Sequence, residues 1–345
     1  MTVAELKQKI KNGDLCDAFL FAGEEDYLKR HYLKELRRTI ITDEGLAPFM
    51  HYVFDGPEVD FAALSDAVRT PSMFADGKLI EWHGALFDGA KEKTLDALRV
   101  LAEEVRQSGD TTLVFLTTAE GLDVGSDANR PSKGFSALSS VLTAIAFFRS
   151  GDRELCGWIA RHFSAEGVAH TPSLPTSLLG RVGHDMSVLS SEIDKLTAIA
   201  KVRGLSEITE REMEEVCVRT VESDAFSFTN ALLDGKTEEA YRYLFDMEKR
   251  RVDPILALGQ VARLYGDLLS VALLAEEGLS PDVIAKKLRM HEYKAKLYFR
   301  AAQKSGVGVL ERNLALCAEI DAAMKSGSPS YTGLQRLVAG GGRVR

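Results

Sequence analysis

The sequence predicts a parallel α/β domain followed by helical domains, and three observations support this fold class. Short apolar runs alternate with helix-period segments from residue 1 to about residue 140, as in a parallel sheet connected by helices. Beyond residue 140 almost every segment has helical periodicity, with one short strand expected at 144–148. Hydrophobic residues make up 45% of the chain and charged residues 27%, which are ordinary values for a globular protein with a core.

The first 140 residues contain four apolar runs that end at turn residues, and between them lie segments whose apolar residues recur every three to four positions. The expected strands are 18–22, 51–54, 78–82 and 111–118, and the expected helices are 27–41, 60–70 and 90–105. Pro71 disfavours helical backbone at Thr70, so the second helix is expected to end there.

The rest of the chain is expected to be helical, with breaks at glycine and proline. The expected helices are 152–166, 175–183, 185–203, 209–220, 226–234, 237–250, 254–277, 280–289, 291–305 and 308–324. We therefore expect three domains: an α/β domain at 1–145, a small helical lid-type domain at 146–208, and an all-helical collar domain at 209–345.

Composition and charge exclude several classes of protein. The chain has 43 basic and 51 acidic residues, a net charge of −8, which argues against a protein that coats nucleic acid with its whole surface. The most apolar stretch, 141–148, is much shorter than the roughly 20 residues of a membrane span. No secretory signal is evident at the start, and four widely spaced cysteines suit reduced thiols, so we expect a cytoplasmic protein without a membrane partner or structural metal.

The sequence lacks the motifs of the common catalytic sites, and we expect no cofactor and no covalent chemistry. The loop after the first strand reads Gly23-Glu-Glu-Asp-Tyr-Leu-Lys29, where a nucleotide-binding protein would have G-x-x-x-x-G-K-[ST]. Three carboxylates stand where phosphates would bind, which opposes an anion by like charge. His83, beside Trp82 at a strand end, is the most suggestive histidine, but it has no identifiable partner in the sequence.

A short connector is the strongest candidate for a binding site. Thr70-Pro71-Ser72-Met73-Phe74 follows the end of a helix and precedes Asp76-Gly77, so Met73 and Phe74 lie outside any periodic core face. They can fold back onto the sheet as core residues, or they can project as anchors for an apolar pocket on a partner. Burying both on a partner would contribute about 3–6 kcal/mol.

A basic run near the C-terminus is the second candidate. Residues 286–304 hold seven basic side chains and one acidic one, a local charge of +6 within a neutral C-terminal third. The possible contacts to a DNA backbone are Lys286, Lys287, Arg289, Lys294 and Lys296. Together with the preceding 278–288 segment, this run resembles a helix-turn-helix, although a charge run can also be a simple solvated face.

Motifs spread along the chain resemble the delta subunit of the bacterial replicative clamp loader, part of DNA polymerase III. The matching segments are Phe21-Ala-Gly-Glu-Glu25 with Tyr27-Leu28, Pro71-Ser-Met-Phe74, Lys78-Leu-Ile80, Leu113-Val-Phe-Leu116, Gly183-His-Asp185, Asp253-Pro-Ile-Leu256, and Asp321 with Lys325-Ser-Gly327. Their order and spacing make the resemblance specific. One departure is Glu292 after His291, where the family often has proline.

The resemblance implies an AAA+-type module of two domains, without its own ATPase activity, and a helical collar domain. It implies a subunit that binds the ring-shaped sliding clamp (beta) and opens it for loading on primed DNA. Met73 and Phe74 map to the pair of apolar residues that enters a pocket on the clamp, with Thr70, Pro71 and Ser72 beside them. The implied partners are the ATPase subunits (tau/gamma) and delta-prime, in a complex that reaches primed DNA as part of a DNA-directed DNA polymerase holoenzyme.

Two other functions stay open from the residues alone. One is a DNA-binding regulator that uses the helix-turn-helix-like segment and its basic face. The other is an ATPase with a degenerate phosphate-binding loop at Gly23.

Overall fold

The computed structural model describes residues 1–71, 77–288, 290, 292–327 and 329–340. These residues divide into two compact units, Met1–Arg149 and Ser150–Arg345. The predicted boundary at residue 145 lies close to the boundary between the units. The further division of the second unit at residue 208 stays a prediction.

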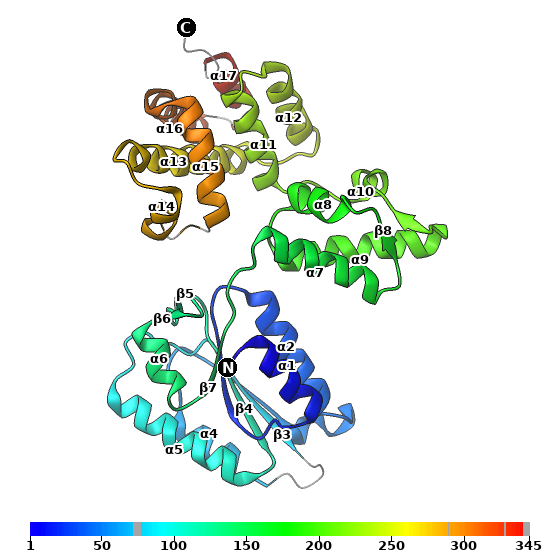
Figure 1. Cartoon of the computed structure of the whole chain (residues 1–345), viewed down its shortest axis with the longest axis vertical. Coiled ribbons are helices and arrows are strands. Elements are labelled where there is room, and N and C mark those ends of the chain that lie inside the picture. Colours follow the sequence, from blue (N-terminus) through cyan, green and yellow to red (C-terminus); the bar gives the residue numbers. More distant parts are fainter. Residues whose placement is uncertain (72–76, 289, 291, 328, 341–345) are drawn as a thin grey trace. The chain divides into compact units, whose positions relative to one another are not determined.

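A parallel sheet forms the centre of the N-terminal unit (Figure 1). It has five strands in the order β2-β3-β4-β1-β7. The strands are β1 (Ala18–Ala22), β2 (His51–Asp55), β3 (Lys78–His83), β4 (Thr111–Leu116) and β7 (Thr143–Ala146). The interior strands are buried almost throughout, because helices cover both faces of the sheet. This burial explains why these strands appear in the sequence as continuous apolar runs.

Helices pack on the two faces of the sheet and make two separate cores (Figure 1). On one face lie α1 (Val3–Asn12) and α2 (Asp26–Ile40), whose Leu6 and Leu36 pack against Phe19 and Phe21 of β1. On the other face lie α4 (Phe61–Arg69), α5 (Glu92–Ser108) and α6 (Lys133–Ser139). The shorter elements of this unit are a 3-10 turn (Glu44–Leu46), α3 (Ala47–Met50) and the antiparallel pair β5 (Gly125–Asp127) and β6 (Arg130–Pro131).

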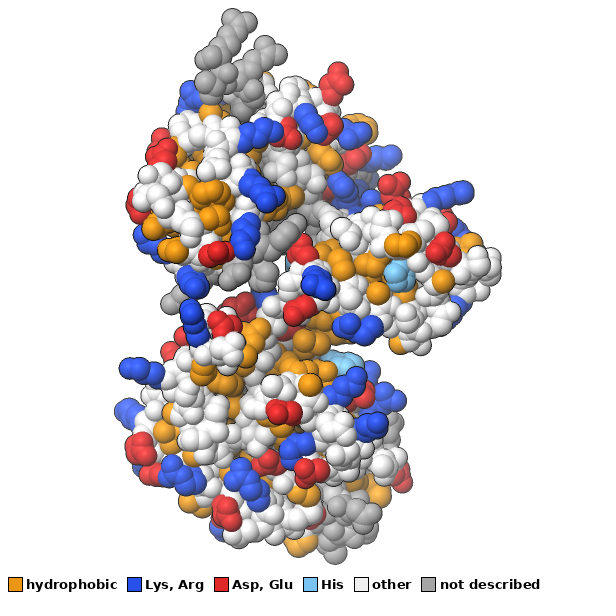
Figure 2. Space-filling view, in the orientation of Figure 1, with side chains coloured by type: hydrophobic (Ala, Val, Ile, Leu, Met, Phe, Trp, Pro, Cys, Tyr) orange, Lys and Arg blue, Asp and Glu red, His pale blue; other side chains and the backbone are white. Residues whose placement is uncertain are grey.

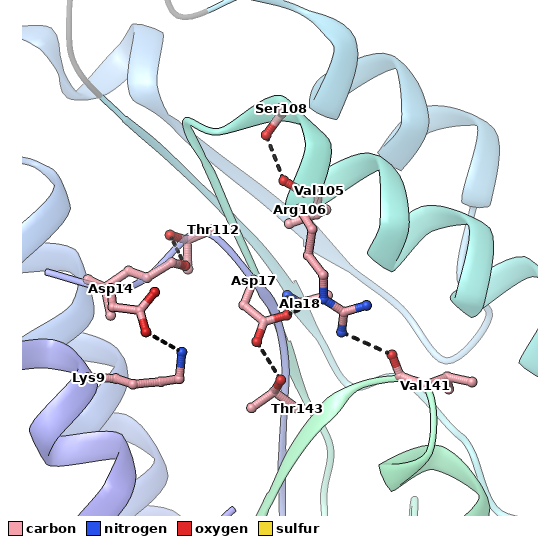
Figure 3. Close-up of polar contacts among 11 residues, drawn as sticks. Lys9, Asp14, Asp17, Ala18, Val105, Arg106, Ser108, Thr112, Val141 and Thr143 are labelled. Carbon is pink, nitrogen blue, oxygen red and sulfur yellow. Dashed lines mark hydrogen bonds and ion pairs between the residues drawn. The ribbon is translucent and has the colours of Figure 1, made fainter.

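Asp17 ties together the amino-terminal edge of the sheet (Figure 3). Its carboxylate accepts hydrogen bonds from Arg106 Nε at the end of α5, at 3.0 Å, and from the Thr143 hydroxyl at the start of β7. Nearby, the Thr112 hydroxyl of β4 donates to the Leu15 carbonyl oxygen over 2.8 Å. These bonds fix the starts of β1, β4 and β7, and they belong to the edge opposite the Gly23 loop.

The C-terminal unit begins with four helices and a short pair of strands. The elements are α7 (Asp152–Ala165), β8 (Ala169–His170), α8 (Leu174–Val182), α9 (Met186–Arg203), β9 (Glu207–Ile208) and α10 (Glu210–Val216). Thr209 begins α10 with a capping box, because its hydroxyl accepts from the Arg211 amide while Glu212 accepts from the Thr209 amide.

The second part of this unit is a helical bundle arranged around α13. Its helices are α11 (Val221–Leu233), α12 (Thr237–Lys249), α13 (Pro254–Glu276), α14 (Pro281–Lys287), α15 (Glu292–Ser305), α16 (Val307–Ser326) and α17 (Thr332–Gly340). Within the described residues, α13 is the one helix long and apolar enough to cross a membrane. Val261, Tyr265, Leu268 and other residues of its inner face are buried in the core of the bundle, which accounts for its apolar character. The sequence-based prediction took 141–148 as the most apolar stretch of the chain and so overlooked this helix.

The predicted fold class is confirmed: a parallel α/β sheet is followed by an all-helical C-terminal part. Two details were wrong. The last strand of the sheet is Thr143–Ala146 instead of 144–148, and the supposedly strand-free second half contains the two-residue parallel pair β8–β9. Helix α1 was not predicted, although the capping box between Thr2 and Glu5 marks its start.

Candidate protein-binding site

The connector at residues 70–77 carries the predicted anchor pair and joins α4 to β3 at the amino-terminal edge of the sheet. As predicted, α4 ends at this point: Thr70 is its C-cap, and both its amide and its hydroxyl donate to the Asp66 carbonyl oxygen, at 3.0 and 2.7 Å. Pro71 is exposed. Ser72, Met73 and Phe74 lie outside the described residues, so their role as contact residues stays a prediction.

The two ends of this connector converge on the side chain of Lys78, the first residue of β3. Lys78 is 1% exposed, and its ammonium donates to the Val68 carbonyl oxygen at 2.6 Å and to the Thr70 carbonyl oxygen. Its amide donates to the Asp110 carbonyl oxygen at 2.8 Å, which fixes the start of β3 beside β4. Burial lowers the pKa of Lys78. The sequence indicated the strand but not this internal contact.

The Gly23 loop at the opposite edge of the sheet is packed against protein backbone. A Cβ atom on Gly23 would lie 2.4 Å from the Phe147 carbonyl oxygen, and Gly23 has a φ of +109°. The Glu25 amide donates to that same oxygen over 3.1 Å, where the amides of a phosphate-binding loop would face an anion. The glycine is therefore required here by the close approach of the Phe147 backbone.

Lys29 fills the space under this loop. Its position matches the lysine of the G-x-x-x-x-G-K pattern counted from Gly23, a spacing that would have singled it out in the sequence. The ammonium is nearly buried and donates to the Gly23 and Thr117 carbonyl oxygens, both at 2.8 Å, and it pairs with Asp26 at 2.7 Å. All these contacts are within the chain, so a phosphate group at this point would have to displace them.

The partner of His83, which the sequence did not identify, is Glu81 of β3, and the two belong to a cluster of charged and histidine side chains. The Glu81 carboxylate is 1% exposed and lies 2.7 Å from His51 Nε2, 2.8 Å from His83 Nε2 and 2.8 Å from an Arg37 nitrogen. Burial alone would raise the pKa of Glu81, but hydrogen bonds from His51, Arg37 and His83 lower it to about 2. The cluster is a satisfied ionic network, and the strand pattern could not reveal it because Arg37 and His51 come from other elements.

Ion pairs offset much of the basic run at 286–304. Lys287 lies 3.6 Å from Glu277, Lys294 lies 3.1 Å from Asp267, and Lys296 lies 3.1 Å from Asp282. Lys286 is exposed, and Arg289 is outside the described residues. On the face that Figure 2 shows, basic and acidic side chains are interspersed over the surface. Among the described residues of the run, these three lysines therefore have acidic neighbours that offset part of the local +6.

The described residues include all four cysteines, of which Cys217 and Cys317 are buried. No group of three or more His, Cys, Asp or Glu side chains among the described residues could hold a metal ion, and the four cysteines are free. Burial raises the pKa of Cys217 and of Cys317 to about 12, so neither is a thiolate near neutral pH. What remains as a candidate site is the connector and the residues that hold it.

Comparisons with known proteins agree with the motifs along the chain. Residues 222–338 match the family model "DNA polymerase III delta subunit, C-terminal domain". The DNA polymerase III subunit delta of Bacillus subtilis (strain 168) is 23% identical over 329 residues, which cover 94% of this chain and 92% of that protein. These matches confirm the resemblance to the delta-subunit family. The region matched by the family model begins in α11 and ends in α17.

A solved delta structure shares the fold. The Bacillus subtilis DNA clamp loader delta protein superposes with a TM-score of 0.74 at 21% identity, covering 97% of this chain and 98% of that chain. The delta-subunit fold therefore extends over both units, the sheet domain included.

Proposed function

We propose that this chain is the delta subunit of a clamp loader, and that it acts by binding the sliding clamp through Met73 and Phe74 and holding its ring open. The observation that carries the proposal is the near full-length match to a delta subunit of DNA polymerase III. The end of α4 adds support, because the helix is capped at Thr70, three residues before Met73 in the sequence.

Ring opening is an equilibrium that the chain shifts by preferential binding. A protein can open the ring only if it binds the open form more tightly than the closed form. Burial of two large apolar side chains would supply about 3–6 kcal/mol, which corresponds to two to four decades of affinity. This is enough for two residues to dominate the interface.

The proposed subunit works without nucleotide of its own. Lys29, Asp26 and the Phe147 backbone occupy the Gly23 loop with internal contacts. The ATPase subunits (tau/gamma) and delta-prime would supply the nucleotide-driven motion in a cytoplasmic hetero-oligomer on primed DNA. In this assembly the collar domain of the predicted three-domain arrangement would join the subunits.

The test is the affinity of the purified chain for the sliding clamp, measured by surface plasmon resonance. The double variant Met73→Ala/Phe74→Ala is expected to lose at least about a hundredfold in affinity, because it removes both anchors. Phe49→Ala is the matched control, since Phe49 is a phenylalanine of the same unit that is 56% exposed, and it should bind like the wild type. Unchanged affinity of the double variant would refute the site.

A DNA-binding regulator is the second candidate, favoured by the exposed Lys286 on α14. Footprinting at physiological salt separates the two functions: a defined operator would support the regulator, whereas sequence-independent, salt-sensitive binding would support a loader that touches DNA. An ATPase is tested by nucleotide titration of the isolated chain, where micromolar affinity for ATP would overturn the nucleotide-free proposal.

A further inference from the structure

One buried ammonium holds both ends of the connector between α4 and β3. Lys78 belongs to β3, at the exit from the connector, whereas Val68 and Thr70 belong to the end of α4, at its entry. The bonds from Lys78 Nζ to the two carbonyl oxygens therefore join the exit to the entry through a side chain that is 1% exposed.

The chemistry of this contact is specific for a long, charged donor. The last carbonyl groups of a helix have no partners within the helix, and they carry the negative end of its dipole. A buried lysine ammonium satisfies two of them at once, and burial of the charge is acceptable only because these acceptors are present. An apolar side chain of similar length would fill the same volume but would leave both carbonyl groups without this donor.

The same connector carries the predicted anchors, so the contact of Lys78 with the end of α4 can affect the affinity for the clamp. If only a fraction of the molecules presents the anchors correctly, the apparent affinity falls in proportion to that fraction. We propose that Lys78 is a positioning residue for the clamp-binding site, which fixes the end of α4 so that the connector is presented to an apolar pocket on the clamp. This inference rests on the proposed function of Met73 and Phe74.

Lys29 provides a matched control. It too is a nearly buried lysine whose ammonium donates to two backbone carbonyl oxygens, but it holds the Gly23 loop at the opposite edge of the sheet. Lys29→Met and Lys78→Met remove the same kind of group. Both variants should have a lower free energy of unfolding. Only Lys78→Met should also have a lower affinity for the clamp, because only Lys78 contacts the end of α4.

The experiment measures clamp affinity and urea unfolding of the full chain for Lys78→Met, Lys29→Met and Met73→Ala/Phe74→Ala. It also measures both for the triple variant Lys78→Met/Met73→Ala/Phe74→Ala. Lys78→Met is expected to bind about tenfold more weakly if the competent fraction falls to a tenth, and Lys29→Met to bind within about twofold of the wild type. In the Met73→Ala/Phe74→Ala background the effect of Lys78→Met should shrink to less than about twofold, because without both anchors the remaining binding no longer depends on how the connector is presented.

The outcomes separate this inference from the proposed function. If Met73→Ala/Phe74→Ala weakens binding but folded Lys78→Met binds like the wild type, or loses no more affinity than Lys29→Met, the role of Lys78 is overturned and the binding site stands. If Met73→Ala/Phe74→Ala has no effect on affinity, both the proposed site and the role of Lys78 are overturned. If Lys78→Met shows no cooperative unfolding, Lys78→Gln takes its place. Glutamine is a shorter, neutral donor, so the Lys78→Gln variant should still bind the clamp more weakly than the wild type. Wild-type affinity of this variant would overturn the inference.

Discussion

Three charged side chains of the N-terminal unit lie almost wholly out of solvent, and each has partners inside the fold. Lys29, Lys78 and Glu81 are at most 3% exposed. The lysines donate to carbonyl oxygens, whereas Glu81 accepts from two histidines and an arginine. A buried charge without such partners is costly, so these contacts determine which substitutions the sheet tolerates.

The sequence could not predict these partners. The run Lys78-Leu-Ile-Glu-Trp82 predicts a strand, but not that its two charged residues are buried, because charged residues in a strand usually face solvent. The acceptors of Lys78 lie 10 and 8 residues away along the chain, and Arg37 is 44 residues from Glu81. Only the packing of α4 and α2 against the sheet brings them together.

The Glu81 cluster predicts a dependence of stability on pH. Because the pKa of Glu81 is lowered from 4.5 to about 2, its contribution is fully present above about pH 4.5 and is lost as the pH falls toward 2. The lowering from 4.5 to about 2 corresponds to at most about 3–4 kcal/mol in the free energy of unfolding. Urea unfolding of the wild type and of Glu81→Gln between pH 5 and pH 3 measures the part of this loss that falls in that window.

The control for this measurement is Glu166→Gln, which removes an exposed carboxylate whose pKa is lowered by a hydrogen bond and charge from Lys201. We expect Glu81→Gln to flatten the loss of stability toward low pH, and Glu166→Gln to leave it nearly as steep as in the wild type. Equal slopes for the wild type and Glu81→Gln would contradict the role given to the cluster.

At the scale of elements, the strongly patterned segments could be predicted and the weakly patterned ones could not. The strands at 18–22 and 78–82 and the long helix at 254–277 were found because apolar runs or helical periods specify them. The pair β8–β9 was missed because two-residue strands carry no periodic pattern. The connector stays a predicted site, proposed for its two apolar residues outside a helix. The bonds from Lys78 to the Val68 and Thr70 carbonyl oxygens could not be predicted, because they depend on tertiary packing.

Helix α13 offers a direct test of the C-terminal core. Leu268 is 2% exposed and lies in the core, whereas Leu273 on the same helix is 44% exposed. Leu268→Ala is expected to lower the free energy of unfolding by about 2–5 kcal/mol, through lost burial and a cavity. Leu273→Ala should cost less than about 1 kcal/mol by urea denaturation. Equal costs would contradict the assignment of α13 as a buried helix of the bundle.

At the scale of the whole molecule, the two edges of the sheet differ: one is filled by contacts within the chain, and the other carries the predicted binding site. The Gly23 loop at the carboxyl edge is stabilised by Lys29 and the Phe147 backbone, in place of a nucleotide. The connector at the amino edge carries the predicted anchors, and Lys78 holds its two ends. In the proposed function the amino edge would bind the clamp, whereas the carboxyl edge is closed by contacts within the chain.

Opening of the clamp in the absence of nucleotide tests the central claim most directly. A clamp labelled with a fluorescence donor and acceptor across one subunit interface is titrated with the purified chain, without ATP. We predict a saturable drop in energy transfer that Met73→Ala/Phe74→Ala abolishes and that added ATP does not change. A clamp that binds the chain yet stays closed, or that opens only when ATP is added to the isolated chain, would contradict the account.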